Sequence, residues 1–429
     1  MHATTSLEPV RVDQRIERID ILRGFALTGV LLVNMMNYGG HSDRWTGSVD
    51  RAFHVVEYFF FEQRFWHLFS LLFGLGFAVQ LLRADAKGVN IVSVYLRRLM
   101  ILFGFGALNN ILWGVDILTD YAILGVFLLP LRRLSPKAVL ALALLLQVAP
   151  TIHGVSQIQW HRYRVRDQEY AARFQQEQKQ QIEDGRRQSE EWRRLMAEGS
   201  FTGIVAHRVP GYIRKLKTPR LRPWDESWWG FFAMFLCGLY AGKRKILQNY
   251  AEHRRFARAV GCVGLMVGVV GMSFLVWAKF FAEPGPPVPT RLLLHHQGPV
   301  VVTTMFLGFT GMTFFYAYVV SEWALTRRWR SLQRGFAAVG RTALSNYILQ
   351  AIVMNVIFMP WGFGFSDQFG PAKTMLLSVP VYVALMLLSV WWVKHFRYGP
   401  AEWLWRTLTY GKLQPMQIGE GGQVSSPGL

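Results

Sequence analysis

Runs of about 20 apolar residues recur along the chain, and the segments between them are rich in arginine and lysine. A helix of that length crosses the roughly 30 Å hydrocarbon core of a bilayer. The runs lack the strict alternation of apolar and polar residues that marks barrel strands. The pattern therefore predicts an all-α, polytopic membrane bundle of about ten helices. The expected helices are residues 19–38, 54–82, 98–114, 117–131, 138–156, 226–242, 259–281, 299–321, 336–359 and 374–393.

The basic residues are unevenly divided between the two ends of these helices. If the N-terminus is cytoplasmic, the cytoplasmic segments hold 24 arginines and lysines, and the four short outer loops hold Arg44, Arg51, Arg291 and Lys373. Cytoplasmic loops of membrane proteins carry the excess of these residues. We therefore expect both ends of the chain to be cytoplasmic.

One connection is long and polar. Residues 157–225 include the stretch QQEQKQQIEDGRRQSEEWRRL, and the parity of the spans places them outside the cell. Within them, residues 165–198 carry apolar anchors at helical spacing, which predicts one or two amphipathic helices. Two interpretations stay open: a solvated helical hairpin, or a lid or acceptor-docking domain over the membrane core. The expected domains are an N-terminal transmembrane half (1–156), this insert, a C-terminal half (226–412) and a disordered tail (413–429).

Composition narrows the function classes. The formal charge of +20 would fit nucleic acid, but the basic residues cluster between apolar runs, so we expect the bilayer and no nucleic acid as partner. Cys237 and Cys262 both fall in apolar runs and are expected to be buried thiols rather than a disulfide. No His/Glu pair recurs at the i, i+4 spacing of a metal motif, so no metal is expected.

Charged and amide side chains inside the apolar runs are the first candidates for a site, because each is costly at lipid depth. Arg64 and His67 are i, i+3 neighbours on one helix, and Arg64 needs a partner such as Asp116 or Glu62. A guanidinium suits bidentate recognition of carboxylate or phosphate. The outer half of the bundle gathers most of these groups. Its substrate-binding candidates are Arg64, Asn37, Asn109 and Tyr121.

Histidine is the side chain best matched to general base work near neutral pH. His67 lies within a predicted span, and His41 lies seven residues after Asn34, near the mouth of the same expected cavity. If a hydroxyl or amine is acylated there, one of these histidines must take its proton. The alternative for each is a hydrogen-bonded structural role. The catalytic candidates are His67, His41, Asn34 and Asp116.

A second group of polar residues falls near the inner ends of the helices. Asp20 and Arg23 have i, i+3 spacing, which fits either an ion pair at the interface or a contact with a cytoplasmic anion or cofactor. The segment GRTALSNYILQ places Arg341 and Asn346 along another span. Asn346 is a further substrate-binding candidate, although hydrogen bonding between packed helices would explain it equally well. The cofactor-binding candidates are Asp20, Arg23 and Arg341.

Five segments of the chain resemble, in order, blocks of the YeiB-like membrane proteins: RIERIDILRGFALTGVLLVNM, RFWHLFSLLFGLGF, DILTDYAILG, GRTALSNYILQ and FRYGPAEWLWRTLTYG. The C-terminal part of that family is known as domain of unknown function number 418. The resemblance covers both ends and most of the chain, apart from residues 157–225. The family is in turn similar to transmembrane acyltransferases such as lysosomal heparan-α-glucosaminide N-acetyltransferase.

The resemblance implies a bundle in a bacterial inner membrane that takes an acyl group from cytoplasmic acyl-CoA. The acceptor would be a sugar, glycan or lipid-linked glycan at the opposite face, and a homodimer is left open. Asp20, Arg23 and Asn34 match the D-x-x-R-G…N pattern of the glucosaminide enzyme. Many YeiB-like proteins carry a histidine near the end of the third helix, where this chain has Leu108 and Asn109.

Two rival functions remain open. A transporter or lipid flippase would use the same buried polar residues as a substrate path, although the two transmembrane halves lack clear internal symmetry. A non-catalytic membrane protein would act through residues 157–225 as a binding surface. The sequence favours the acyltransferase hypothesis over both.

Overall fold

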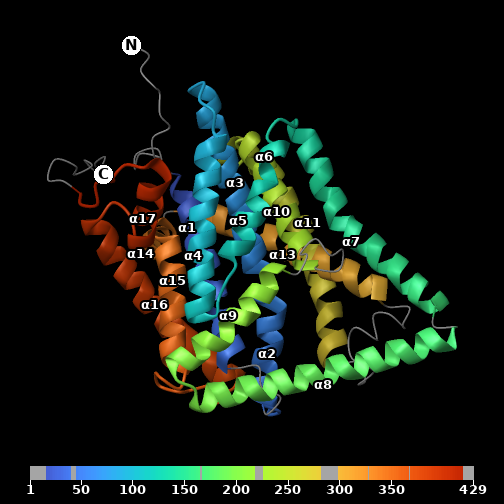
Figure 1. The fold of residues 1–429 in the computed structure, drawn as a ribbon. Coiled ribbons are helices and arrows are strands. Elements are labelled where there is room, and N and C mark those ends of the chain that lie inside the picture. The colour runs from blue at the N-terminus through green and yellow to red at the C-terminus, as the bar shows by residue number, and fades with distance from the viewer. Residues whose placement is uncertain are drawn as a thin grey trace.

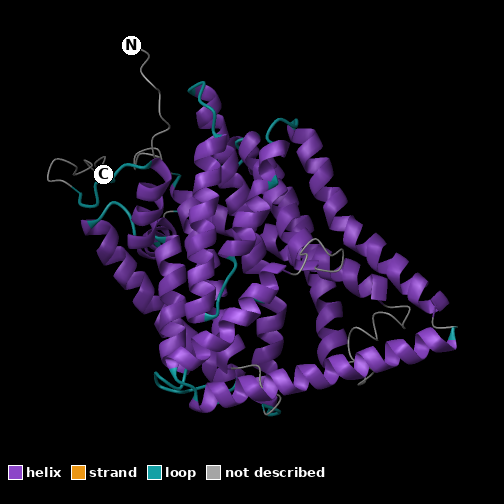
Figure 2. Cartoon of the chain, in the orientation of Figure 1, coloured by secondary structure: helices purple, strands orange, loops and turns teal. Residues whose placement is uncertain are grey.

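The computed structural model describes residues 16–39, 45–164, 167–217, 226–281, 298–326, 328–366 and 368–418. Over these ranges the chain is almost entirely helical (Figure 2), and its one β-contact is an isolated bridge between Phe396 and Gln417. The all-α prediction is confirmed. The helices are α1 (Glu17–Gly39), α2 (Ser48–Phe60), α3 (Arg64–Ala86), α4 (Val92–Trp113), α5 (Leu118–Val126), α6 (Leu128–Leu131), α7 (Pro136–Arg164), α8 (Gln168–Glu198), α9 (Phe201–Lys217), α10 (Glu226–Lys243), α11 (Tyr250–Val276), η2 (Trp277–Phe281), α13 (Gly298–Trp323), α14 (Arg330–Arg341), α15 (Ala343–Phe358), α16 (Pro371–His395) and α17 (Pro400–Tyr410).

Several of these helices have the character of membrane spans. Within the described ranges, five segments are long and apolar enough to cross a bilayer: Glu17–Gly39, Ser48–Ala86, Val92–Trp113, Tyr250–Phe281 and Pro371–His395. Pro136–Ala149 and Ala343–Phe358 are shorter apolar helices. The chain is therefore a membrane-type helical protein, while the count of ten spans stays a prediction.

Three of the predicted helices are broken in the structure. The expected helix 54–82 is divided into α2 and α3, and Gln63, which immediately precedes α3, adopts a positive φ of 68° that breaks the helical path. The expected helix 336–359 is divided at Thr342, whose hydroxyl donates back to the Ala338 carbonyl. The expected helix 117–131 is divided into α5 and α6. The first two breaks fall at the polar residues Gln63 and Thr342, whereas the third falls at the apolar Phe127.

Glycines let the helices of the bundle approach closely. α3 packs against α10, α1 against α14, and α11 against α13. Gly74 of α3 faces the backbone of Phe235 in α10, and Gly340 of α14 faces the backbone of Asp20 in α1, with no room for a Cβ at either position. Small residues at a helix interface permit such close approach of two backbones in a membrane bundle.

The polar insert forms two further helices at one end of the bundle. α8 covers most of the region 165–198, which confirms the predicted amphipathic helix. α8 and α9 lie at the end opposite α17 (Figure 1). α9 packs against α4. The insert therefore includes one helix that is attached to the membrane core.

Two smaller predictions concern the cysteines and the C-terminal tail. Cys237 and Cys262 are free thiols, but only Cys237 is partly buried, and the expected burial of Cys262 is wrong because its face of α11 is exposed. Residues 413–418 of the expected disordered tail lie alongside the end of α16, where the Arg397 N–H donates to the Met416 carbonyl at 2.9 Å. The rest of that tail lies outside the described residues.

We expect Gly340→Ala to destabilise the bundle, because the new Cβ would collide with the Asp20 carbonyl in α1. Overpacking of this kind costs about 1–3 kcal/mol. The melting temperature of the detergent-purified protein measures the effect. Gly104→Ala is the matched control, since a Cβ there meets no atom within 4 Å. Equal melting temperatures for the two variants would contradict the close contact.

Candidate functional site

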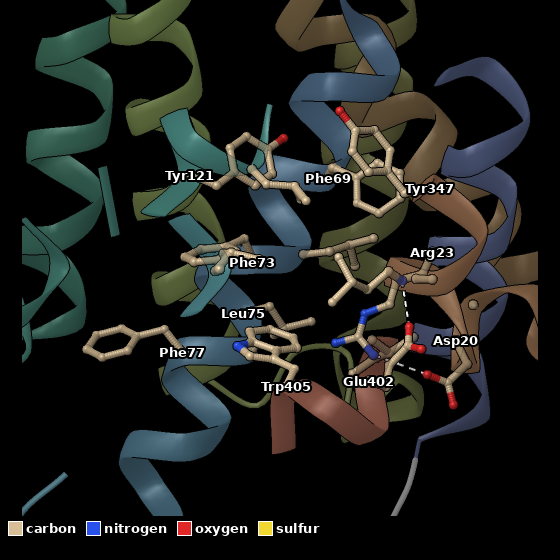
Figure 3. A pocket seen from close by; sticks show the side chains of 18 of the residues that line it. Asp20, Arg23, Phe69, Phe73, Leu75, Phe77, Tyr121, Tyr347, Glu402 and Trp405 are labelled. Atoms are coloured by element: carbon tan, nitrogen blue, oxygen red, sulfur yellow. Dashed lines mark hydrogen bonds and ion pairs between the residues drawn. The ribbon is translucent and has the colours of Figure 1, made fainter. Parts of the chain in front are cut away.

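A cavity of about 310 Å³ lies among α1, α3, α4, α5, α15 and α17 (Figure 3). Along α3 its lining residues extend from Trp66 to Arg83. At 1.5 Å of rise per residue these two positions are about 26 Å apart, close to the thickness of the hydrocarbon core. The cavity therefore follows one helix across most of the bundle.

One end of the cavity is positively charged. Five arginines and two carboxylates, Asp20 and Glu402, line it, so positive charge is in excess. The arginines come from the helix ends nearest α17. They are Arg23, Arg83, Arg98, Arg341 and Arg406. Guanidinium groups gathered in this way suit phosphate or carboxylate groups of a ligand.

Asp20 and Arg23 form an ion pair, which is one of the two alternatives that their spacing leaves open. The Arg23 Nη1–Asp20 Oδ1 distance is 3.1 Å, and the Asp20 side chain is buried while that of Arg23 is 35% exposed. A guanidinium carries five N–H donors, so one carboxylate contact leaves others for a ligand. The Arg23 Nη2 atom is also the nearest atom to a Cβ placed at Gly76, at 3.9 Å. Arg23 therefore extends across the cavity toward α3.

Helix α17 forms part of the wall at the charged end. The Arg98 guanidinium carbon lies 4.0 Å from the centroid of the Trp405 ring, and the Trp405 indole N–H donates to the Arg98 carbonyl at 3.0 Å. Arg98 also donates to the Gln80 side chain at 3.4 Å. These contacts hold one cavity arginine between α3 and α17.

Glu402 attaches α17 to the start of α15. Thr342 precedes that helix, but its hydroxyl is used by the preceding turn and does not cap α15. Instead the Glu402 carboxylate accepts the N–H groups of Leu344 at 2.6 Å and Ser345 at 3.2 Å. Burial raises the pKa of the Glu402 carboxyl, and hydrogen bonds from Ser345 and Leu344 oppose that rise. A side chain from another helix thus performs the capping.

The other end of the cavity is aromatic and closed by two tyrosines (Figure 3). The Tyr121 hydroxyl donates to the Trp66 carbonyl at 2.6 Å and accepts from Ser70 at 2.9 Å. The Tyr347 hydroxyl accepts the Ile117 N–H at 3.2 Å. A hydroxyl that accepts one hydrogen bond still carries its own proton as a donor. This end can therefore contact an apolar chain and one polar group.

Four sequence candidates line the cavity: Asp20, Arg23 and Arg341 at the charged end, and Tyr121 at the aromatic end. The structure thus brings the three predicted cofactor-binding residues together. Tyr121 lines the same cavity at its other end, whereas the candidates that were expected near it, Arg64, Asn37 and Asn109, do not line the cavity.

Arg64 and His67 lie together elsewhere, on the side of α3 that faces α13. The His67 Nδ1 lies 2.8 Å from the Gln63 carbonyl, and its ring packs against Phe231 and Phe309. The Arg64 guanidinium lies over the Phe309 ring and donates to the Glu62 carbonyl. Neither residue lines the cavity.

The expected pairing of Arg64 with Asp116 is wrong. The Asp116 carboxylate accepts from the Thr119 N–H at 2.8 Å and from the Lys215 ammonium of α9 at 3.2 Å. The second suggested partner of Arg64, Glu62, contacts it through its backbone carbonyl, and its carboxylate lies 3.6 Å from Lys279. Lys215, a residue of the polar insert, therefore pairs with Asp116 in place of Arg64.

The remaining sequence candidates are four asparagines and His41. Asn109 donates to the Val115 carbonyl at 2.6 Å, and Asn346 donates to Thr342 and to Ser389. Asn34 is buried and Asn37 is exposed. None of these four residues lines the cavity. His41 lies outside the described residues.

Sequence reasoning missed several residues of the charged end. Arg83, Arg98 and Arg406 lie next to apolar runs, as do the basic residues that orient membrane proteins, so their positions in the sequence do not distinguish them from such flanking residues. Gln80 and Glu402 gave no signal beyond their presence beside these arginines. Among the described residues, no group of three or more His, Cys, Asp or Glu side chains could hold a metal ion.

Comparison with known proteins identifies uncharacterized relatives. Residues 241–412 match the family "Protein of unknown function (DUF418)". The chain is 29% identical to the uncharacterized protein YxaH of Bacillus subtilis, over 96% of this chain and 98% of that protein. It is 26% identical to an uncharacterized 39.9 kDa protein of Bacillus acidopullulyticus (96% and 99% covered) and 25% identical to YeiB of Escherichia coli (92% and 96% covered). No solved structure matches the chain.

We expect Glu402→Ala to loosen α17, because the N–H groups of Leu344 and Ser345 lose their acceptor. Loss of a helix cap costs about 0.5–2 kcal/mol. Glu402→Gln keeps one oxygen as an acceptor and is the control. Melting temperature and protease cleavage within α17 provide the measurement. Unchanged cleavage in Glu402→Ala would contradict the capping role.

Proposed function

We propose that this chain, which belongs to the YeiB-like DUF418 family, is a membrane acyltransferase that uses cytoplasmic acyl-CoA as its donor. The observation that supports this function is the cavity, which has an arginine-rich end, an aromatic end and a length of about 26 Å along α3. Acyl-CoA has a matching arrangement, because its phosphate groups lie at one end and its thioester lies at the end of a flexible arm.

The charged end would bind the donor's phosphates. Arg341, Arg98 and Arg406 come from three different helices, so together they can approach a multiply charged anion from several sides. Arginine is well suited to this contact because its planar guanidinium binds phosphate oxygens in pairs. The Asp20–Arg23 ion pair would orient Arg23 toward the same anion.

The aromatic end would hold the thioester. An extended arm that starts at the arginines and follows α3 reaches Tyr121 and Tyr347. The Tyr347 hydroxyl, held by the Ile117 N–H, can donate its proton to a carbonyl oxygen of the donor. In this arrangement the acyl group is carried to the outer part of the bundle without the phosphates leaving the inner end.

The reaction would transfer the acyl group to a sugar, glycan or lipid-linked acceptor at the outer face. An acceptor hydroxyl or amine attacks the thioester carbonyl, the C–S bond breaks, and an ester or amide forms as the CoA thiol leaves. The acceptor proton needs a base, and the sequence candidates are His67, which packs against Phe309 of α13 and does not line the cavity, and His41, which lies outside the described residues. Asn34, the candidate for stabilising the oxyanion, does not line the cavity, and the carboxylate of Asp116, the candidate for orienting the base, is engaged by Thr119 and Lys215.

The proposal includes a topology of ten spans in a bacterial inner membrane, with both chain ends inside. The five cavity arginines support this orientation, since they come from helix ends that the basic-residue count assigns to the cytoplasm. Acyl-CoA is a cytoplasmic metabolite and would meet the charged end directly. α8 and α9 would then lie outside.

We expect Arg341→Gln to weaken acetyl-CoA binding by about ten- to a hundredfold, since a hydrogen bond to a charged group contributes about 1.5–3 kcal/mol. The readout is the rise in melting temperature with acetyl-CoA concentration, compared with free CoA. Arg334→Gln, on the exposed side of the same helix, is the control and should bind normally. Equal affinities for the two variants would remove Arg341 from the donor site.

A second variant tests the cavity without removing a charge. Gly76→Leu adds a side chain at a position where a Cβ meets only the end of Arg23 within 4 Å. It should fill part of the cavity and lower acetyl-CoA affinity while the melting temperature without ligand stays close to normal. Gly104→Leu, on α4 and outside the cavity, is the matched control.

We expect His67→Ala or His41→Ala to lower acyl transfer by about 10²–10⁴-fold, the usual contribution of a general base. Transfer from radiolabelled acetyl-CoA to the glycan and lipid fractions of the membrane measures this. Acetyl-CoA binding and melting temperature separate a catalytic defect from a structural one. Full activity in both variants would exclude both histidines as the base, and uptake without a covalent product would favour a transporter or flippase.

A further inference from the structure

Helix α9 is attached to the bundle most firmly by its first half. Ile204 is fully buried in a cluster with Met196 and Met359. Arg208 is also buried, and it donates to the Leu112 carbonyl at 2.6 Å and to the Asn355 side chain at 3.2 Å. Apolar burial and two hydrogen bonds fix this half to the outer ends of α4 and α15.

The helix has a weak point immediately after this anchor. Pro210 lies inside α9 and has no N–H for the helical hydrogen bond, and its ring crowds the preceding turn. Gly211 follows, and no atom lies within 4 Å of a Cβ placed there. Both residues are exposed. Helices bend sharply at such positions.

The second half of α9 makes polar contacts to residues 116–120, which lead into α5 and form its first turn. The buried Tyr212 hydroxyl lies 3.0 Å from the Thr119 hydroxyl. The Lys215 ammonium lies 3.2 Å from the Asp116 carboxylate and 3.3 Å from that of Asp120. The Lys215 side chain is 36% exposed, so water can compete for its contacts.

The same segment, residues 116–120, lies against the aromatic end of the cavity. Asp116, Thr119 and Asp120 face α9, whereas Ile117 and Leu118 line the cavity, as does Tyr121 one turn later. One helical turn therefore separates the second half of α9 from the space inside the bundle.

We propose that residues 212–217 of α9 form a lid over the outer end of the cavity, hinged at Pro210–Gly211 and latched by Lys215 to Asp116 and Asp120. Release of the latch frees residues 116–120 and admits a molecule from the outer face to the aromatic end. The anchored first half keeps the lid in place for reclosure. The lid concerns access to the cavity, so it does not depend on acyl-CoA being the ligand.

The experiment measures access to one cavity position from the outer face. Leu118→Cys is introduced into a Cys237→Ala, Cys262→Ala background and reconstituted in vesicles of known orientation. A membrane-impermeant thiol reagent is added on the side of α8, and the rate of modification is followed by mass. We expect slow modification with the latch intact and modification at least tenfold faster with Lys215→Met.

Matched variants separate the latch from general loosening. Lys215→Arg keeps the charge and should leave the rate slow. Lys179→Met makes the same change at an exposed position of α8 and should have no effect. Pro210→Ala with Gly211→Ala, added to Lys215→Met, should return the rate toward its slow value by straightening the hinge.

Three results would overturn the lid. The first is an equal rate with and without Lys215→Met. The second is acceleration only when the reagent is on the side of α17. The third is acceleration by Lys179→Met as large as that by Lys215→Met. Melting temperatures of all variants distinguish local opening from unfolding, since a lid that opens alone leaves the main transition unchanged. Failure of acetyl-CoA binding would disprove the donor site and leave these rates unaffected.

Discussion

The close packing of α3 against α10 is the constraint on which the site depends. Gly74 of α3 and Gly238 of α10 each face the backbone of the other helix, so the two helices meet without intervening side chains. Large residues of α3 are thereby directed elsewhere, and those from Trp66 to Arg83 that line the cavity form one continuous wall. A rigid wall matters here because van der Waals packing, rather than the hydrophobic effect, holds helices together in lipid. The cavity can persist as open space only if its walls are supported from behind.

Polar groups inside the bundle have two distinct uses, which the sequence alone does not separate. Arg64, Asn109 and Asn346 make hydrogen bonds to carbonyls or side chains nearby, as every buried polar group in lipid must. Asp20 and Arg23 also pair with each other but face open space at the same time. Hydropathy shows that both kinds of polar residue lie within apolar segments, but it does not tell the two kinds apart. The two kinds differ in whether a neighbouring helix covers the polar side chain or leaves it facing the cavity. Which of the two occurs depends on packing between helices that are distant in the sequence.

The sequence predicts the helical class and the amphipathic helix of the insert, and it identifies Asp20 and Arg23 as neighbours that form either an ion pair or a contact with an anion. It does not predict the breaks at Gln63 and Thr342, because local backbone conformation there is decided by neighbours distant in the chain. The charged end of the cavity was hidden for a different reason. Arginines that flank an apolar run look alike whether they face lipid headgroups or, as Arg83 and Arg98 do, a cavity. Lys215 gave no signal because its partners, Asp116 and Asp120, lie about 100 residues earlier in the chain.

The two ends of the cavity are closed by different physical means, and this asymmetry favours ordered access. At the charged end, α17 is held by a carboxylate that caps α15 and by a stacked arginine. At the aromatic end, the second half of α9 is held by the contact of Tyr212 with Thr119 and by Lys215, which keeps contact with solvent and follows a proline and a glycine. Solvent-exposed ion pairs such as that of Lys215 are the weaker kind of contact and break first. A ligand bound at the arginines would therefore stay in place while the aromatic end opens, which is the order that a transfer between two faces of a membrane requires.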